Sequence, residues 1–388
     1  LIKAGEYVRG TNARIGFVAT NSITQGDQVA QLWPVLFGRC GLEIAFAHRT
    51  FAWGSDARGK ANVHVVILGL DRREAVPPER RLFSYPDIAS DPEESRHAAL
   101  SPYLFDAGRL ADPHIVVQNE RKPINNTKRL QFGTQPLEDG NLTFSREEKQ
   151  VFLESEPSAA PHFRPFLGAE EFINGEERWI LHSADIPVNE LHNLPILKKR
   201  LQAVREFRSR SKRQITNRLA DYPTSYGVTV IPDREFLIIP RVSSERREYA
   251  PIGWVSPPAI PSEATMALQD ATLADFALLT SAMHMAWLRN IGGRLESRYR
   301  YSIGVVYNTF PLPRGGGRFV EIGAARASRA GRSRHSSGRD ARRPLRPGLD
   351  AAEPSPGASS ARSRGGPALP ARRVCVRTGE GGTSFRAV

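Results

Sequence analysis

The sequence is poor in cysteine and has no long apolar segment. Its 388 residues include only two cysteines, Cys40 and Cys375, which stand in unrelated surroundings. Two distant cysteines exclude a disulfide framework and a cysteine-rich zinc site, and they suit a reducing compartment. No apolar run approaches the roughly 20 residues that cross a bilayer, and no signal peptide is visible. We therefore expect a protein of the bacterial cytoplasm that does not enter a membrane.

Lysine is absent from the last part of the chain. Residues 315–388 contain fifteen Arg, no Lys and five acidic residues, so this segment carries most of the formal net charge of +13. Arg, Ala, Gly and Pro dominate it, and no hydrophobic period survives. We interpret 314–388 as a disordered, frame-shifted tail rather than a functional basic arm. The basic pI is therefore weak evidence that the folded part binds nucleic acid.

The segment from Ala13 to Leu70 has the pattern of the closing half of an α/β sheet. Ile15–Thr20 is a strand-like run, and apolar residues at helical spacing follow it, namely Val29, Leu32, Trp33 and Leu36. Two further apolar runs, Leu42–Ala47 and Val63–Leu70, are close enough to pair as an antiparallel hairpin.

A polar loop is predicted between these two strands, and it holds the first candidate site residues. Phe51 and Trp53 stand on this loop beside cationic residues that include Lys60. Aromatic rings beside cations could stack on a flat ring next to a phosphate. The alternative is that the two rings only cover the open end of the hairpin.

The next segments predict connections and one long helix. Residues 71–112 are rich in Pro and charge and are interpreted as connecting structure. Residues 122–141 form a loop that either approaches a nucleic acid, with Lys122 on a phosphate and Asn125 near a base edge, or is an ordinary surface loop. A basic amphipathic helix over 191–219 either follows a phosphate backbone or presents a solvated face.

The best candidate segment for reading base edges lies between residues 241 and 249, where short strands and turns alternate. Arg can make two hydrogen bonds to guanine, and Glu can accept one from cytosine. Side chains alternate between the two faces of a strand, so only some of the residues in 241–249 can face one groove. An exposed strand with ion pairs is the alternative. The candidates for nucleic-acid contact here and in neighbouring basic segments are Arg164, Arg241, Ser243, Ser244, Glu245, Arg246, Arg247, Arg298 and Arg300.

One histidine could suggest a ligand site. His284 stands in a predicted helix over 273–289, among Met and aromatic residues. A lone histidine in such surroundings is more often a core residue, and we predict no metal site. Residues 294–313 combine basic and aromatic residues and then a strand pattern, and Tyr301 is a further candidate for nucleic-acid contact.

Several long sequence words resemble the MmeI-like, type IIL restriction–modification enzymes, which combine adenine-N6 DNA methylation with cleavage in one chain. In order they are TNSITQGDQV, HRTFAW, GKANVHVVILG, KPIN, FGTQPLEDGNL, RPFLGAEEFINGEERW, VSSERREYAPIGW, LTSAMHMAWLR and RYRYSIGVVYNTFPLP. The resemblance implies an α/β fold, the truncated end of a class I S-adenosylmethionine-dependent methyltransferase sheet, followed by an α+β target-recognition domain. The implied segments are 1–90 (methyltransferase), 91–160 (connecting and facing the active site) and 161–313 (target recognition and exit).

Two motifs that this family needs are missing from the chain. There is no Gly-rich strand-to-helix turn for S-adenosylmethionine and no Asn/Asp-Pro-Pro-aromatic tetrapeptide; Ser256–Ala259 lacks the aromatic residue. We therefore expect a fragment that is inactive alone, with the cofactor serving the full-length enzyme and Mg²⁺ only a missing nuclease domain. The implied partners are duplex DNA and the missing N-terminal part of the enzyme.

The resemblance also implies a role for the aromatic loop. The amino group of a paired adenine is sheltered in the base stack, so the base must be flipped out before it reacts. Phe51 or, failing that, Trp53 would stack on the flipped adenine. The alternative function is a non-catalytic, sequence-specific DNA-binding module.

Overall fold

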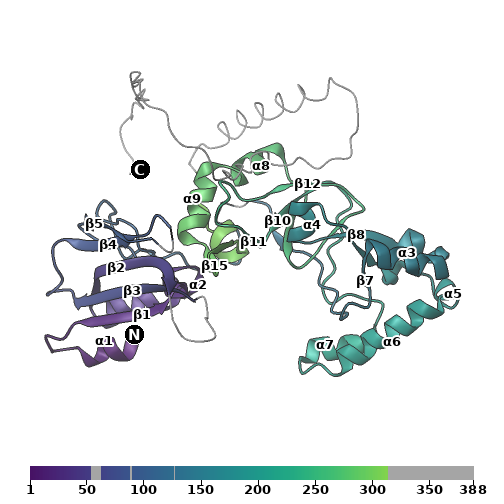
Figure 1. Cartoon of the computed structure of the whole chain (residues 1–388), viewed down its shortest axis with the longest axis horizontal. Coiled ribbons are helices and arrows are strands. Elements are labelled where there is room, and N and C mark those ends of the chain that lie inside the picture. Colours follow the sequence, from purple (N-terminus) through teal and green to yellow (C-terminus); the bar gives the residue numbers. More distant parts are fainter. Residues whose placement is uncertain (54–62, 88–89, 126, 313–388) are drawn as a thin grey trace, which may run out of the picture. The chain divides into compact units, whose positions relative to one another are not determined.

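The first β-sheet is formed by five strands near the start of the chain. In the computed structural model, which describes residues 1–53, 63–87, 90–125 and 127–312, the strands lie in the order β1-β3-β2-β4-β5 (Figure 1). Their bounds are Ile15–Thr20 (β1), Leu42–Trp53 (β2), Val63–Arg72 (β3), Arg80–Ser84 (β4) and Glu93–His97 (β5). Only β2 and β4 are parallel, and the predicted antiparallel pair β2–β3 is confirmed.

Three helical segments contribute to the core on one face of this sheet: α1 (Ile2–Tyr7), α2 (Asp27–Pro34) and a π-helical turn (Val35–Arg39). Trp33 is fully buried among the apolar residues of the strands. Its indole N–H donates to the carbonyl oxygen of Ile23 at 2.7 Å, so the polar atom of this large ring is satisfied. The predicted first strand and the helix after it are confirmed.

Strand β2 is longer than expected, and the polar loop is correspondingly shorter. The strand continues through His48 and Phe51 to Trp53, and Phe51 pairs with Val65. A β-bulge between His48 and Phe51 shifts the register, which hides the alternation by which a strand is recognised. Phe51 and Trp53 therefore stand on a strand and not on a loop, which corrects the prediction. Lys60 lies outside the described residues.

The interpretation of residues 71–112 as connecting structure is wrong, because β4 and β5 lie in this stretch. Strand β5 forms the edge of the sheet, and most of its residues are exposed. The two strands are joined by charge as well as by backbone: Arg81 donates two hydrogen bonds to Glu94, at 2.8 and 3.0 Å. Charged side chains are typical of edge strands, where they oppose pairing with other chains. The charged sequence of β5 therefore resembles that of a linker.

The rest of the described chain forms three smaller sheets, in the orders β12-β10-β14-β6, β11-β16-β15 and β13-β8-β9-β7. The strands are Gln131–Phe132 (β6), Thr143–Ser145 (β7), Phe163–Leu167 (β8), Arg178–Leu181 (β9), Phe236–Pro240 (β10), Val242–Ser243 (β11), Gly253–Val255 (β12), Ile260–Pro261 (β13), Thr265–Leu268 (β14), Gly293–Leu295 (β15) and Arg298–Arg300 (β16). The helices are Arg146–Ser155 (α3), Ala169–Asn174 (α4), Val188–Leu191 (α5), Pro195–Ser209 (α6), Gln214–Arg218 (α7), Leu273–Leu279 (α8) and Ala282–Ile291 (α9). This mixture of sheets and helices agrees with the expected α+β region.

The basic amphipathic helix predicted over 191–219 is not continuous, because α6 ends at Ser209 and α7 begins at Gln214. One of the cations of α6 is also buried. Arg208 is fully buried, and its guanidinium donates hydrogen bonds of 2.8–3.1 Å to five backbone carbonyl oxygens, those of Pro136, Leu137, Leu219, Tyr222 and Ser225. All five N–H groups that an arginine carries are thereby used. Arg208 fits neither a phosphate contact nor a solvated face, because it joins the FGTQPLEDGNL segment to the residues after α6.

The helix predicted over 273–289 is in fact two helices, α8 and α9. The hydroxyl of Ser281 accepts from the backbone N–H of His284 at 3.1 Å and so begins a new helix. His284 is fully buried, and its Nε2 lies 2.7 Å from the hydroxyl oxygen of Tyr301. Burial lowers the pKa of His284 to about 4. The prediction of a core histidine is confirmed. Tyr301 is buried with it and does not face a ligand surface.

Two smaller predictions near these elements need correction. Asn-Gly before an apolar run is a hairpin signal and predicts a hairpin turn at Asn174–Gly175. In the structure, Gly175, with φ of +76°, instead ends helix α4 in the left-handed conformation that favours glycine. The strand expected after the basic and aromatic residues of 294–313 is wrong: the apolar run Ile303–Tyr307 is a π-helical turn, and the short strands β15 and β16 precede it. Its buried residues Val305 and Val306 pack in two of the cores.

Candidate nucleic-acid interface

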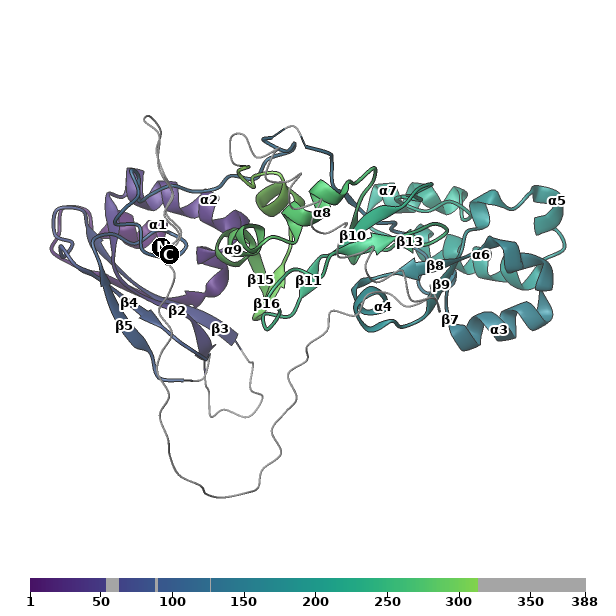
Figure 2. The ribbon, with the colours of Figure 1, turned by 90° about the horizontal axis from the view of Figure 1, so that it is seen from above.

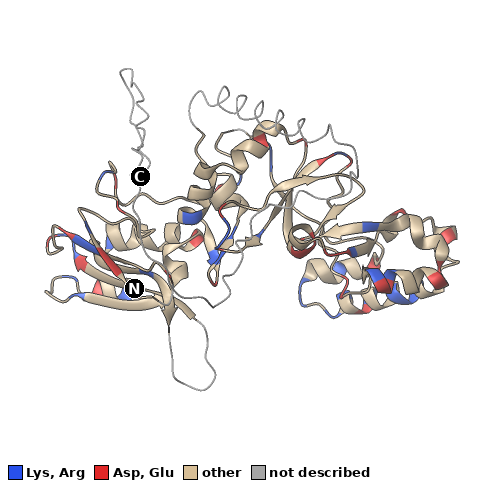
Figure 3. Cartoon of the chain, turned by 45° about the horizontal axis from the view of Figure 1, so that its top comes forward, with Lys and Arg blue, Asp and Glu red and all other residues tan. Residues whose placement is uncertain are grey.

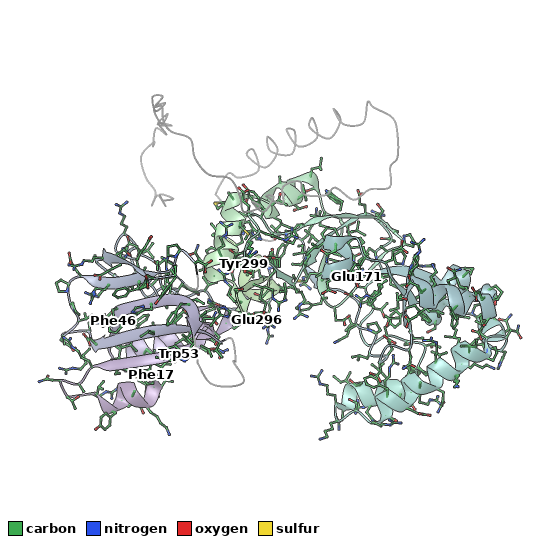
Figure 4. All side chains as sticks on the ribbon, in the orientation of Figure 1. Phe17, Phe46, Trp53, Glu171, Glu296 and Tyr299 are labelled. Atoms are coloured by element: carbon green, nitrogen blue, oxygen red, sulfur yellow. The ribbon has the colours of Figure 1, made fainter. Side chains whose placement is uncertain are left out.

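Aromatic side chains line one face of strand β2. The rings of Phe46, His48, Phe51 and Trp53 follow one another with centroids 6.3–6.4 Å apart; Figure 4 labels the first and the last of them. His48 and Phe51 would point to opposite faces of a regular strand, and the β-bulge between them brings their rings to the same face. Gly69 on β3 leaves room for Phe46, since a Cβ atom there would lie 2.0 Å from its ring.

Two residues at the end of β4 complete this aromatic face. Phe83 stacks on His48 with ring centroids 4.2 Å apart, and Tyr85 stacks on Phe51 at 4.9 Å. The hydroxyl oxygen of Tyr85 lies 2.9 Å from Nδ1 of His48. Burial, and to a lesser extent the charge of Arg81, lowers the pKa of His48, so its ring is neutral at pH 7. Tyr85 therefore covers one face of Phe51 and is held there by a neutral hydrogen bond.

A cleft of about 360 Å³ lies beside Tyr85. Segments that are distant in the sequence form its walls, namely 24–25, 49–50, 84–85, 103–104 and 289–299. The first four belong to the first sheet and its connections, and the last comprises the end of α9 and the β15–β16 hairpin; Figure 2 shows this hairpin next to α9. The cleft thus combines residues of the words TNSITQGDQV, HRTFAW, LTSAMHMAWLR and RYRYSIGVVYNTFPLP.

Close contacts join the two walls of this cleft. The backbone N–H of Gly26 donates to the carbonyl oxygen of Ile291 at 3.1 Å, and the amide of Asn21 donates to that of Glu296 at 3.4 Å. Gly26 has a φ of +58°, and a Cβ atom on it would lie 3.3 Å from Cα of Gly293. A glycine therefore suits this position both for its conformation and for the close backbone approach.

The cleft is positively charged. Arg49, Arg289 and Arg294 line it, and no lining residue among those described is Asp or Glu. Each of the three guanidinium groups donates to a backbone carbonyl oxygen at 2.8–2.9 Å. Desolvation lowers the pKa of Arg49 and of Arg294, yet both groups stay charged at neutral pH. Within the described ranges, none of these arginines forms an ion pair with a carboxylate. Glu245 is nevertheless close enough to Arg294 for its charge to act against the lowering of that pKa, whereas only burial acts on the pKa of Arg49.

The two basic segments that were singled out from the sequence lie side by side. Strand β11 pairs antiparallel with β16, so that Val242 is opposite Arg300 and Ser243 is opposite Tyr299. Ser243 is buried by this pairing, whereas Arg246 and Arg300 are exposed. The words VSSERRE and RYRY thus form one surface although they are far apart in the chain.

The other residues of this segment are partly exposed. The hydroxyl of Ser244 accepts from the backbone N–H of Arg246 at 3.2 Å, which defines a local turn. Glu245 and Arg247 keep part of their side chains accessible. The carbonyl oxygen of Arg247 also accepts a long hydrogen bond from Arg289, at 3.4 Å, which links the segment to the cleft.

Several of the remaining candidates already have partners within the protein. The amide of Asn125 donates to the carbonyl oxygen of Phe310 at 2.6 Å. Arg164 and Arg241 donate to nearby backbone carbonyl oxygens. Arg298 forms an ion pair of 2.9 Å with Glu296. Lys122 is exposed, and Figure 3 shows that basic and acidic residues are intermixed on the ribbon.

Three residues of the site were not identified from the sequence, namely Tyr85, Arg289 and Arg294, whereas Arg49 is one of the cations of the predicted polar loop. Arg49 stands inside the word HRTFAW, and Arg289 ends the word LTSAMHMAWLR. A cation inside or beside a matching word was therefore the available signal. The sequence alone does not show that these residues meet, because their segments are separated by up to nearly two thirds of the chain.

The part of the chain that the structure describes has neither grouped metal ligands nor a membrane-spanning helix. There, no group of three His, Cys, Asp or Glu residues is placed to hold a metal ion. None of the helices described is long and apolar enough to cross a membrane.

Two family models match the chain. The MmeI DNA-methyltransferase domain matches residues 1–84, and the MmeI target recognition domain matches residues 111–314. DNA methyltransferase A of Bacillus subtilis (strain 168) is 35% identical over 308 residues, which are 79% of this chain and 34% of that protein. The solved structure of the type IIL restriction–modification enzyme MmeI in complex with DNA is 39% identical, with a TM-score of 0.79, over 87% of this chain and 44% of that one.

The fold, the site and these matches define a DNA-methyltransferase segment followed by a target-recognition domain. The chain belongs to the family of MmeI-like, type IIL restriction–modification enzymes, which confirms the family inferred from the sequence words. It spans less than half of the length of the relatives it matches.

Proposed function

We propose that this chain is the part of a site-specific adenine-N6 DNA methyltransferase that recognises the target sequence and receives the flipped adenine. One observation carries the proposal: the stacked pair Phe51–Tyr85 borders a cleft lined by three arginines and, among the described residues, by no Asp or Glu. Aromatic rings bind an unstacked base by stacking, and arginines neutralise the phosphates beside it. The family match supports DNA as the partner.

Of the two aromatic candidates, we propose Phe51 as the residue that stacks on the base. It is half-buried, and Tyr85 lies both against its ring and in the wall of the cleft. A rotation of Tyr85 alone would therefore open Phe51 to a base that enters from the cleft. Trp53 is 44% exposed at the end of β2 and is the second candidate.

Base reading is proposed for the surface that β11 and β16 form together. Arg246, Arg247 and Arg300 offer the donors that guanine accepts, and Glu245 offers an acceptor for cytosine. Asn125, Arg164, Arg241 and Arg298 already contact other parts of the chain, so they fit backbone contacts or support better than direct reading. Lys60, Lys122, Ser243 and Ser244 stay proposals for DNA contact.

S-adenosylmethionine supplies the methyl group in DNA methylation, but the residues of this chain do not form its site. Strand β1 continues into Asn21–Ser22 without a Gly-rich turn, and the sequence has no Asn/Asp-Pro-Pro-aromatic tetrapeptide. We propose that the N-terminal part of the same enzyme, in the bacterial cytoplasm, supplies both and that Mg²⁺ serves only a nuclease domain. Strand β1 lies at an edge of the sheet with Val18 half exposed, which supports such a partner.

The proposal predicts how methyl transfer responds to the two aromatic residues. The chain alone is expected to transfer no methyl group, and the chain joined to an N-terminal segment with the two missing motifs is expected to methylate adenine N6. In the joined protein, Phe51→Ala is expected to lower the transfer rate by about 5- to 150-fold, because base stacking contributes about 1–3 kcal/mol. Transfer of tritium from labelled cofactor to duplex DNA measures it. Methylation by the chain alone would refute the inactivity, and a larger loss in Trp53→Ala would reverse the assignment.

The second candidate is a DNA-binding module without a catalytic role. The hydrophobic cores of the target-recognition region support this function, because residues of that region alone form them. Sequence-specific binding together with an absence of methyl transfer in the joined protein would favour this function.

A further inference from the structure

We propose that Arg49, Arg289 and Arg294 bind the phosphodiester group next to the flipped nucleotide, in the cleft beside Tyr85. The proposal rests on the function proposed above and names the part of the DNA that this cleft takes. Arg289 and Arg294 were not among the candidates from the sequence, and the segments of the three arginines meet only in the fold.

The charge of the cleft carries the first step of the argument. Some other cations of the chain have carboxylate partners, such as Lys128 with Asp275 at 2.8 Å and Arg178 with Glu171 at 2.7 Å, and the buried Arg208 uses all its donors on carbonyl oxygens. The three cleft arginines are held by neutral carbonyl oxygens, and Arg294 also packs on the ring of Tyr299, with its guanidinium carbon 4.2 Å from the ring centroid. The charge of Glu245 acts on Arg294, so Arg49 and Arg289 are the two guanidinium groups that carbonyl oxygens position without a carboxylate beside them. Such groups are suited to an anion.

The lining of the cleft indicates which anion. Hydroxyl and amide side chains accompany the arginines, among them Gln25, Thr50, Ser84 and Asn290. These groups can donate to phosphate and sugar oxygens, which is the usual composition of a backbone contact to DNA. The volume, about 360 Å³, falls within the range of about 300–1,000 Å³ for sites that hold a small group. A polar, cationic cleft of this size fits one sugar–phosphate unit.

The position of Tyr85 connects this phosphate to the flipped base. Tyr85 lines the cleft with one side and stacks on Phe51 with its ring. A phosphate in the cleft would therefore lie one side chain away from the proposed base-stacking position. Arg289 also donates to the carbonyl oxygens of Arg247 and Glu248, in the segment proposed to read bases. The cleft is thus placed between the base-reading surface and the base-stacking face.

Salt dependence of DNA binding tests the proposal. The protein is titrated with a mixed-sequence duplex between about 50 and about 200 mM salt, and each phosphate contact contributes about 0.9 to the slope of log affinity against log salt. Arg289→Gln and the double variant Arg49→Gln, Arg289→Gln are expected to lower the slope by about 0.9 and about 1.8. Arg289→Lys keeps the charge and is expected to keep the slope. The matched control is Arg146→Gln, an exposed arginine of α3 with a 3.7 Å contact to Glu177.

The outcomes separate this proposal from the proposed function. A wild-type protein that does not bind duplex DNA overturns the proposed function itself. If the wild type binds but the cleft variants lose no more slope than Arg146→Gln, the function stands and the phosphate site is refuted. If Arg289→Gln changes only the preference between sequences while the slope is unchanged, Arg289 supports the base-reading segment and the phosphate assignment is wrong. Thermal melts of each variant exclude unfolding as the cause.

Discussion

Arg208→Met is expected to lower the free energy of unfolding by about 3–5 kcal/mol. The guanidinium group is fully buried and serves five carbonyl oxygens, from Pro136 to Ser225. Methionine fills a similar volume but donates no hydrogen bond, and a buried polar group without a partner costs about 1–3 kcal/mol. In Arg208→Met, several buried carbonyl oxygens would lose their hydrogen-bond donor at once. Arg208→Lys is expected to be destabilising as well, because an ammonium group has three donors where five are used.

Denaturant unfolding, followed by circular dichroism, measures this effect. Arg210→Met is the matched control: it is two residues away, its side chain is 79% exposed, and its contact to Glu206 is 3.7 Å long. The control is expected to change the unfolding free energy by no more than about 0.5 kcal/mol. Equal effects of the two substitutions would show that the buried hydrogen bonds of Arg208 do not stabilise the fold.

Acidification is expected to destabilise the protein through His284. Burial lowers its pKa in the folded state to about 4, against 6.5 for the ordinary group. The unfolded state therefore binds more protons between these values. The contribution of the neutral His284 to the free energy of unfolding is fully present above pH 6.5. It is lost as the pH falls from 6.5 toward the pKa of the folded state. The loss amounts to about 3 kcal/mol when the pH reaches about 4.

The difference between the wild type and His284→Gln isolates this contribution. Unfolding free energies are measured for both at several pH values, and the two curves are expected to converge as the pH falls. His192→Gln, at an exposed histidine beside Lys198, is the control and is expected to run parallel to the wild type. Wild-type and His284→Gln curves that stay parallel from neutral to acidic pH would contradict a buried neutral histidine.

The elements that could be predicted from the sequence are those whose local pattern is regular. The run Ile15–Thr20 and the hairpin of β2 and β3 have long apolar stretches, and both are present. The end of β2 was missed because a β-bulge interrupts the alternation, and β5 was missed because an edge strand with EESRH has no apolar face. The break before α9 had a signal in Ser281, a typical helix cap.

The site shows a different limit. Phe51 was identified because it stands in a recognisable word, whereas its partner Tyr85 follows the end of another strand, β4. Arg208 has the same sequence surroundings as the exposed Arg210, and only the carbonyl oxygens from distant segments make the difference. The arginines of the cleft are likewise brought together by packing between α9 and the first sheet. Local sequence patterns do not show which residues from distant segments come into contact.

Selection of bound sequences from a random duplex library tests the central claim most directly. The protein is incubated with the library, the bound fraction is recovered and amplified over several rounds, and the products are sequenced. A target-recognition domain predicts that one short motif with an adenine at a fixed position is enriched. Variants at Arg246 or Arg300 are expected to change that motif rather than abolish binding. Binding that enriches no motif, or no binding at all, would contradict the account.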